Sequence, residues 1–253
     1  MATLEALLAA VLAAPDDEDA RLAYSDAVAA TDVARAELIK LQIVLARWRR
    51  NRENPATRPE ASARQTVLLE QHAQRWAAAI APHVKGWSFL RGFVEVVRLD
   101  AAKFLDTAPL LYRTAPILHL DLENVKPVAA QLFASPYLAR IHSLGLKQNE
   151  LGDAEAKALA ASPHLGALRW LALANNAIGE AGLEALAAST DLPALGYVDF
   201  RWNSADDPTP QDADEYSADS PAAVALQKKF GKRSWLTAKP RFAWPPERDA
   251  VVE

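Results

Sequence analysis

Three segments of the chain repeat one pattern: the end of an expected helix, a short turn, and apolar residues at fixed spacing before an asparagine. The segments are LFASPYLARIHSLGLKQN, LAASPHLGALRWLALANN and LAASTDLPALGYVDFRWN. Their equivalent residues Leu144, Leu171 and Val198 follow one another at intervals of 27 residues. A fixed period of this length predicts a stack of similar units, because each unit buries its apolar side only against its neighbours.

The pattern L-x-x-L-x-L-x-x-N is typical of a leucine-rich repeat, in which the leucines of a short parallel strand face the core. Earlier strand pairs, Val97 with Leu99 and Leu120 with Leu122, are spaced by 23 and 24 residues and predict irregular units at the entry. Residues 87–203 are therefore expected to form a short α/β solenoid with a parallel concave sheet and convex helices. A period of 27 leaves room for a full helix, as in ribonuclease-inhibitor-like repeats.

Each of the last three units ends its strand with an asparagine: Asn149, Asn176 and Asn203. A turn that leaves a sheet has backbone N–H and C=O groups without a ladder partner, and buried groups of this kind need a hydrogen bond. A side-chain amide can donate and accept at once. We expect these three amides to be buried and to bond to the turns.

The regions flanking the repeats have different compositions. Residues 1–50 predict a compact helical unit: a first helix with apolar residues at helical spacing, a second from about Asp19 to Ala30 and a third from Ala34 to Arg50. Residues 51–86 predict a polar linker, NRENPATRPEAS, and a connecting helix. Residues 204–253 predict an acidic loop, a capping helix over 221–230 and a Pro-rich tail.

The first fifty residues resemble the bacterial repeat-companion domain, a helical module that precedes repeats. The phrase RGFVEVVRLDAAKF at Arg91 to Phe104 also resembles that family's entry into its repeats. The residues of the first phrase that carry the resemblance are Pro15, Asp17, Arg21, Leu22, Tyr24, Asp26, Arg35, Glu37, Ile39 and Gln42. The resemblance implies an all-α companion domain ahead of the repeats, in a bacterial protein, and it implies no biochemical activity.

Composition narrows the classes of function. The net charge of −4 and the pI near 5.8 give no global reason to expect nucleic acid or an anionic membrane as a partner. The absence of cysteine excludes disulfides, thiolate metal sites and cysteine nucleophiles. No Lys or Arg precedes Arg21, and Glu5 interrupts the amino-terminal apolar run, so this run predicts a helix rather than a secretory signal. We expect a cytoplasmic protein without a membrane-spanning segment.

The candidate binding surface is the open face of the strands. Side chains alternate along a strand, so the residues between the leucines face away from the helices and form rows across the sheet. Trp, Tyr and Arg gather at the exit end of these rows, and these residue types dominate binding energy at protein interfaces. We therefore expect an unidentified protein partner, anchored there. The candidate residues are Trp170, Tyr197, Asp199, Arg201, Trp202, His119, Asp121, Glu123 and Lys147. In the alternative interpretation, Trp170 and Trp202 pack under the carboxyl cap.

Catalysis has little support from the sequence. His119 and Ser143 are expected to be lateral neighbours, with Asp121 on the same face, but the serine lacks a nucleophile elbow and an oxyanion site. The five histidines form no H-x-x-x-H pair, and neither a calcium-loop nor a nucleotide-binding motif occurs. The chain is expected not to be an enzyme and to bind no metal or cofactor.

Two other functions stay open. The segment Arg47 to Arg64, with Trp48, combines basic and aromatic residues and could bind nucleic acid, although arginines also suit a helix carboxyl terminus. An inhibitor or immunity-type protein that occludes a partner enzyme is the narrower form of protein recognition.

The charged residues Arg21, Asp26, Arg35 and Glu37 are expected to pair across the second and third helices and fix their packing. The oligomeric state does not follow from the sequence.

Overall fold

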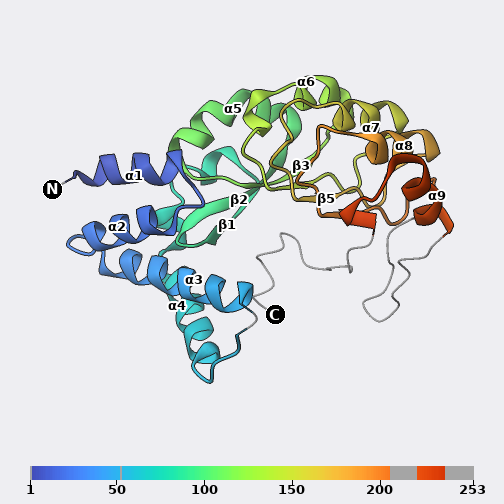
Figure 1. Cartoon of the computed structure of the whole chain (residues 1–253). Helices are drawn as coiled ribbons and strands as arrows, with labels where there is room; N and C mark the ends of the chain where they lie inside the picture. Colours follow the sequence, from blue (N-terminus) through green and yellow to red (C-terminus); the bar gives the residue numbers. More distant parts are fainter. Residues whose placement is uncertain (1, 52, 206–220, 237–253) are drawn as a thin grey trace. The chain divides into compact units, whose positions relative to one another are not determined.

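The computed structural model describes residues 2–51, 53–205 and 221–236. The expected α/β class is confirmed: helices accompany one mostly parallel sheet of six strands in the order β1-β2-β3-β4-β5-β6 (Figure 1). The strands are β1 (Gly86–Leu90), β2 (Phe93–Asp100), β3 (His119–Glu123), β4 (Ser143–Gly145), β5 (Trp170–Ala172) and β6 (Tyr197–Asp199). The expected Pro-rich tail and most of the expected acidic loop lie outside the described residues.

The described residues divide into two compact units. One contains residues 2–97, without 52, and residues 109–117; the other contains residues 98–108, 118–205 and 221–236. The division passes through β2 and through helix α5 (Ala101–Thr114). We call them the head unit and the repeat unit.

The head unit begins with three helices, α1 (Leu4–Ala13), α2 (Glu18–Val28) and α3 (Val33–Arg50), within two residues of the expected bounds of the second and third. Aspartates cap two of them. Asp17 Oδ1 accepts from the N–H groups of Asp19 at 2.9 Å and Ala20 at 3.2 Å, and Asp32 Oδ1 accepts from that of Arg35 at 3.0 Å. These caps satisfy first-turn donors that have no partner within the helix.

The connecting helix starts earlier than expected. Helix α4 covers Arg58–Trp76, so the second half of the phrase NRENPATRPEAS is helical rather than linker. Proline at the start of this helix explains the difference, since the first turn has no use for the missing N–H and the ring presets a helical φ. The 3₁₀ turn η1 (Ala81–His83) then leads into β1.

The hairpin formed by β1 and β2 was not expected from the sequence. Its two-residue turn is Arg91 and Gly92, with φ of 46° and 85°. Both residues are left-handed, as a tight hairpin turn requires. A Cβ added to Gly92 would lie 2.3 Å from Cγ1 of Ile39, so only glycine fits against α3 at this point.

The repeat unit has the register expected from its leucines. His119 pairs with Ser143, Ser143 with Trp170 and Trp170 with Tyr197, and these three strand pairs are parallel. One residue along, Leu120, Leu144, Leu171 and Val198 are successive Cα partners. The expected registers of β3 to β6 are therefore confirmed.

The helices of the repeat unit lie along one side of these strands. Figure 1 shows α6 (Ala129–Phe133), α7 (Asp153–Ala160) and α8 (Glu180–Ala188) in succession on that side. The 3₁₀ turns η2 (Lys126–Val128) and η3 (Pro136–Leu138) flank α6. The expected capping helix is α9 (Pro221–Phe230), which packs against α8 and is followed by the 3₁₀ turn η4 (Ser234–Leu236) beside β6.

The three strand-closing asparagines bond to the turns as expected, but only Asn149 is buried, whereas Asn176 and Asn203 are partly exposed. Asn149 Oδ1 accepts from the Val125 N–H at 2.9 Å, and Asn149 Nδ2 donates to the Leu122 carbonyl at 2.8 Å. Asn176 repeats this arrangement one unit later, with Oδ1 accepting from Asn149 and Leu151 at 3.0 Å each. Asn203 continues it, with its Oδ1 accepting from Ile178 at 3.1 Å. Each amide thereby joins its own turn to the preceding unit.

Candidate functional site

The row of strand-face residues that begins at His119 is buried. His119, Ser143, Trp170 and Tyr197 are neighbours in the register, and their burial leaves Trp170 5% and Tyr197 8% exposed. The two aromatic rings stack, with centroids 3.8 Å apart and an interplanar angle of 29°. Trp170 and Tyr197 therefore contribute to the packing of this face in the present structure and offer little surface to a partner.

Further along the strands, Asp199, Lys147 and Arg201 form a compact ion cluster. Arg201 Nε and Nη2 donate to the two Asp199 carboxylate oxygens at 2.8 and 2.9 Å, and Lys147 Nζ lies 3.0 Å from Oδ2. Burial of Asp199 by itself raises the pKa of the carboxyl, but the bonds from Arg201 and Lys147 outweigh it and leave the pKa below its ordinary value. The carboxylate is thus held ionised between two cations.

Trp202 is the exposed aromatic of the expected cluster. Its side chain is 71% exposed, and the guanidinium carbon of Arg201 lies 5.1 Å from its ring centroid. Its backbone is left-handed, with φ of 58°. The carboxyl-cap alternative is therefore wrong for Trp202, whereas Trp170 is indeed buried.

The left-handed backbone recurs at the same position in four successive units. The residues and their φ values are Asn124 (53°), Gln148 (57°), Asn175 (58°) and Trp202 (58°). Asparagine tolerates this conformation well, but a bulky side chain with positive φ is rare. The last unit thus has tryptophan where two earlier units have the residue that suits the backbone.

The acidic candidates lie at the opposite end of the strand face, on β3. Asp121 and Glu123 are partly exposed. Arg98 Nε lies 3.7 Å from Glu123 Oε1, and Asn124 Nδ2 donates to Asp100 Oδ1. The acidic candidates thus lie on the entry strand beside Arg98, whereas Lys147 and Arg201 pair with Asp199.

The register confirms that His119 and Ser143 are lateral neighbours. Both are about 1% exposed, whereas Asp121 is partly exposed. The serine lies within strand β4 and not at the amino terminus of a helix. Within the described residues, the serine therefore has no helix amino terminus to stabilise an oxyanion.

The basic segment from Arg47 to Arg64 is largely paired within the head unit. Glu18 accepts from Arg47 at 2.7 Å and from Arg50 at 3.0 Å. Glu37 accepts two bonds of 2.7 Å from Arg64. The Arg64 bonds hold the pKa of Glu37 below its ordinary value, so this carboxylate stays charged. These carboxylates compete with any phosphate for the guanidinium groups, while Arg52 of the same segment lies outside the described residues.

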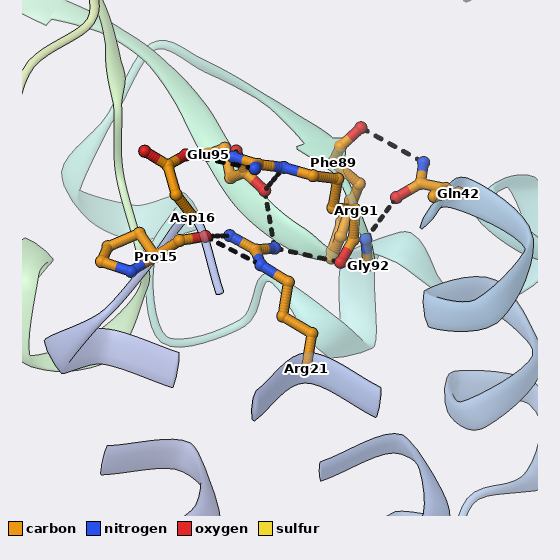
Figure 2. A network of polar contacts seen from close by, with 8 residues as sticks. All are labelled: Pro15, Asp16, Arg21, Gln42, Phe89, Arg91, Gly92 and Glu95. Atoms are coloured by element: carbon orange, nitrogen blue, oxygen red, sulfur yellow. Dashed lines mark hydrogen bonds and ion pairs between the residues drawn. The ribbon is translucent and has the colours of Figure 1, made fainter. Parts of the chain in front are cut away.

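Figure 2 shows a buried polar network in the head unit, centred on Arg21. Arg21 and Glu95 are both fully buried and form an ion pair of 2.7 Å. Arg21 also donates to the carbonyls of Pro15 at 2.9 Å and Arg91 at 3.0 Å. Arg91 Nη2 contacts the second Glu95 oxygen at 2.6 Å. Every one of these bonds joins chain segments of the head unit, so we assign the network to packing.

Gln42 extends the same network to the hairpin. Its Nε2 donates to the Phe89 carbonyl at 3.2 Å, and its Oε1 accepts from the Gly92 N–H at 2.7 Å (Figure 2). The buried face of α3 therefore meets the hairpin through one side-chain amide.

The expected pairing among Arg21, Asp26, Arg35 and Glu37 is wrong. Asp26 pairs with Lys40 at 2.6 Å, Glu37 with Arg64 and Arg21 with Glu95. Arg35 instead lies among aromatic rings: its guanidinium carbon is 5.0 to 5.1 Å from the ring centroids of Trp76, Phe89 and Phe93. Burial lowers the pKa of Arg35 to about 10. Because this value is still well above 7, the side chain is charged at neutral pH. Asp26 does pair across the second and third helices, but with Lys40, whereas the partners of Arg21 and Glu37 come from segments outside these helices.

The helical side of the repeat unit has a hollow of about 360 Å³ between α6 and α7, whose lining includes four alanines, Lys126 and Glu155. Among the residues that the structure describes, no three His, Asp or Glu side chains gather in a metal-binding arrangement. No helix in the described ranges is long and apolar enough to cross a membrane.

No protein-family model, curated protein or solved structure matches the chain. The interpretation of the surface therefore depends on its own geometry.

Proposed function

We propose that the chain is a protein-recognition module that binds a partner through the strand face of the repeat unit, with Trp202 as its anchor. The observation that carries the proposal is the combination of exposure and backbone conformation at Trp202, which is 71% exposed with φ of 58°. A left-handed conformation costs a residue other than glycine or asparagine about 1–2 kcal/mol. An exposed tryptophan gains little burial in return, so its place is better explained by contact with another molecule.

The surroundings of Trp202 suit such a contact. Arg201 lies over its ring and is fixed by Asp199, so the platform is preorganised. Fixing side chains before association lowers the entropy lost on binding. Tryptophan and arginine are also the residue types most enriched where truncation costs the most affinity.

The finer parts of the architecture belong to the same proposal. We assign the repeat unit to a short leucine-rich-repeat arc on the support of the 27-residue intervals, the recurring left-handed residue and the asparagine bonds. The resemblance of the head unit to a repeat-companion domain supports a helical companion domain that precedes the repeats in the sequence of a bacterial cytoplasmic protein. The inhibitor or immunity-type role is the narrower form, and a captured enzyme that loses activity upon binding one copy of the chain would support it.

The test is crosslinked capture from native extract with the full chain, its Trp202→Asn variant and a control, Tyr137→Ala, with proteins and nucleic acids both identified. Tyr137 is an exposed aromatic on η3 and belongs to no strand. We expect a protein partner that the wild type and control capture and that Trp202→Asn retains at least tenfold less. Nuclease-sensitive capture that the Trp202 variant leaves unchanged would contradict the proposal and favour the Arg47 to Arg64 segment.

A further inference from the structure

The exposed side chains at the carboxyl ends of the strands form one row across the repeat unit. The row contains Asn124, Gln148, Asn175 and Trp202, all exposed and all with left-handed backbone. Adjacent strands are about 4.8 Å apart, so the row is about 14 Å long. The row in front of it, from His119 to Tyr197, is buried. A ligand that contacts this face without displacing the buried row therefore meets a narrow strip.

Charge along this strip is uneven. Asp199 is the carboxylate between Lys147 and Arg201, so this cluster of two cations and one anion has a net charge of +1. Lys147 is the accessible member, with its side chain 40% exposed. An ammonium has three donors, and Asp199 accepts one of them. On the neighbouring strand lie the carboxylates of Asp121 and Glu123, the latter 3.7 Å from Arg98.

We propose that the bound element of the partner is a short extended segment that places an apolar or aromatic side chain on Trp202 and a carboxylate on Lys147. The inference rests on the proposed function and specifies the chemistry of the partner. Charge complementarity commits it to an acidic segment, because Lys147 is the exposed cation beside the aromatic platform. Four or five residues of extended chain, at about 3.3 Å each, cover the row.

The positions of the two anchors set a spacing in the ligand. Lys147 follows β4 and Trp202 follows β6, two strand intervals or about 10 Å apart across the sheet. Three residues of extended chain cover this distance, so the apolar residue and the carboxylate are expected at positions i and i+3. Between the anchors, the exposed amides of Gln148 and Asn175 can each donate to and accept from the main chain of the segment.

A single-stranded nucleic acid is the alternative ligand, since a tryptophan can stack a base and a lysine can bind a phosphate. The carboxylates of Asp121 and Glu123 disfavour it, because a continuous chain of phosphates along the row passes both. A peptide with one carboxylate at the correct position avoids that repulsion.

The test is a selection of random twelve-residue peptides displayed on phage, with the full-length protein as bait. Parallel selections use Trp202→Asn, Lys147→Gln and the control Lys157→Gln, which removes the same charge from an exposed position on α7. A labelled single-stranded oligonucleotide of fifteen bases is titrated against the same four proteins. Melting curves of all four establish that they are folded.

We expect the wild type and Lys157→Gln to enrich peptides with an aromatic or large apolar residue three positions from Asp or Glu. Trp202→Asn is expected to bind them at least tenfold more weakly, and Lys147→Gln to lose the preference for the acid while still requiring the apolar residue. In a further arm, Lys147→Glu is expected to enrich Lys or Arg at that position. If repulsion between the new carboxylate and Asp199 destabilises the Lys147→Glu variant, the Lys147→Gln variant still shows whether Lys147 selects the acidic residue.

Other results separate the two proposals. Peptides that depend on Trp202 but show no acidic preference overturn the inference and leave the proposed function intact. A selection that enriches no Trp202-dependent peptide overturns the extended-segment ligand, while crosslinked capture decides the proposed function independently. Oligonucleotide binding that Trp202→Asn and Lys147→Gln both weaken overturns the peptide inference in favour of nucleic acid.

Discussion

The two units of the chain solve the problem of buried polar groups in different ways. The head unit buries full charges, with Arg21 and Glu95 completely inaccessible and joined across 74 positions of sequence. The repeat unit satisfies its turns with neutral amides: Asn149, which is buried, and Asn176 and Asn203, which are partly buried, each bond one unit back, 24 to 30 positions away. The difference teaches that a repeated fold can satisfy its turns with one residue type at one position, whereas the head unit needs a unique set of partners.

The largest effect is expected from breaking the buried ion pair of the head unit. Replacing Glu95 with Gln leaves Arg21 and Arg91 without their shared buried carboxylate, and removing one partner of a buried ion pair costs about 3–5 kcal/mol. We expect the Glu95→Gln variant to lose about that much unfolding free energy in urea denaturation followed by circular dichroism. The control Asp26→Asn breaks the exposed pair with Lys40 and should cost less than about 1 kcal/mol. Equal losses for the two variants would refute the assigned role of the network.

The amide side is tested next. The Asn176→Ala variant deprives the N–H groups of Asn149 and Leu151 and the carbonyl of Leu146 of their side-chain partner. A backbone group left unsatisfied costs about 1–3 kcal/mol, and we expect a total loss of about 3 kcal/mol. The neighbouring Asn175→Ala change affects an exposed side chain and should cost only about 1 kcal/mol, for the left-handed backbone. Urea denaturation of both variants measures the difference, and a larger loss for Asn175→Ala would contradict the assignment.

These two tests also mark what the sequence could predict. The registers of β3 to β6 and the role of the asparagines followed from spacing alone, because the same leucine and asparagine positions recur in several units. The Arg21–Glu95 pair and the β1–β2 hairpin did not follow, since their partners lie far apart and the Arg91–Gly92 turn lacks the usual Asn-Gly signal. The alternation of side chains along a strand placed Trp170, Tyr197 and Trp202 near one another. It predicts the face of the sheet on which a side chain lies, but not whether that side chain is buried. The asparagines at 124 and 175 were a signal for the left-handed row, because asparagine favours that backbone.

A smaller effect is expected from Asp199, the buried charge of the repeat unit. Its pKa in the folded state is lowered, so its ionised form stabilises the fold fully above the ordinary carboxyl pKa of about 4 and loses that contribution as the pH falls through the folded-state pKa. The difference in melting temperature between the wild type and Asp199→Asn should be constant from pH 7 to about pH 5. It should shrink as the pH falls below about 4. A difference that grows on acidification would contradict the sign of the shift.

The smallest expected effect on stability concerns Trp202. Asparagine suits the left-handed backbone better, so Trp202→Asn should change the unfolding free energy by no more than about 1 kcal/mol and in the stabilising direction. The reciprocal change, Asn175→Trp, should destabilise the repeat unit by a similar amount. Thermal melts of the two variants check this pair of predictions. A loss of several kcal/mol for Trp202→Asn would mean that the tryptophan serves the fold.

The most direct test of the central claim is site-specific photocrosslinking from position 202 in native extract. A benzoyl-phenylalanine in place of Trp202 keeps an aromatic ring on the strip, and the same residue in place of Tyr137 is the matched control. We predict that irradiation joins one protein species to position 202 and leaves the control uncrosslinked. If position 202 yields no crosslink beyond the control, or yields only nucleic acid, Trp202 is not the anchor of a protein interface.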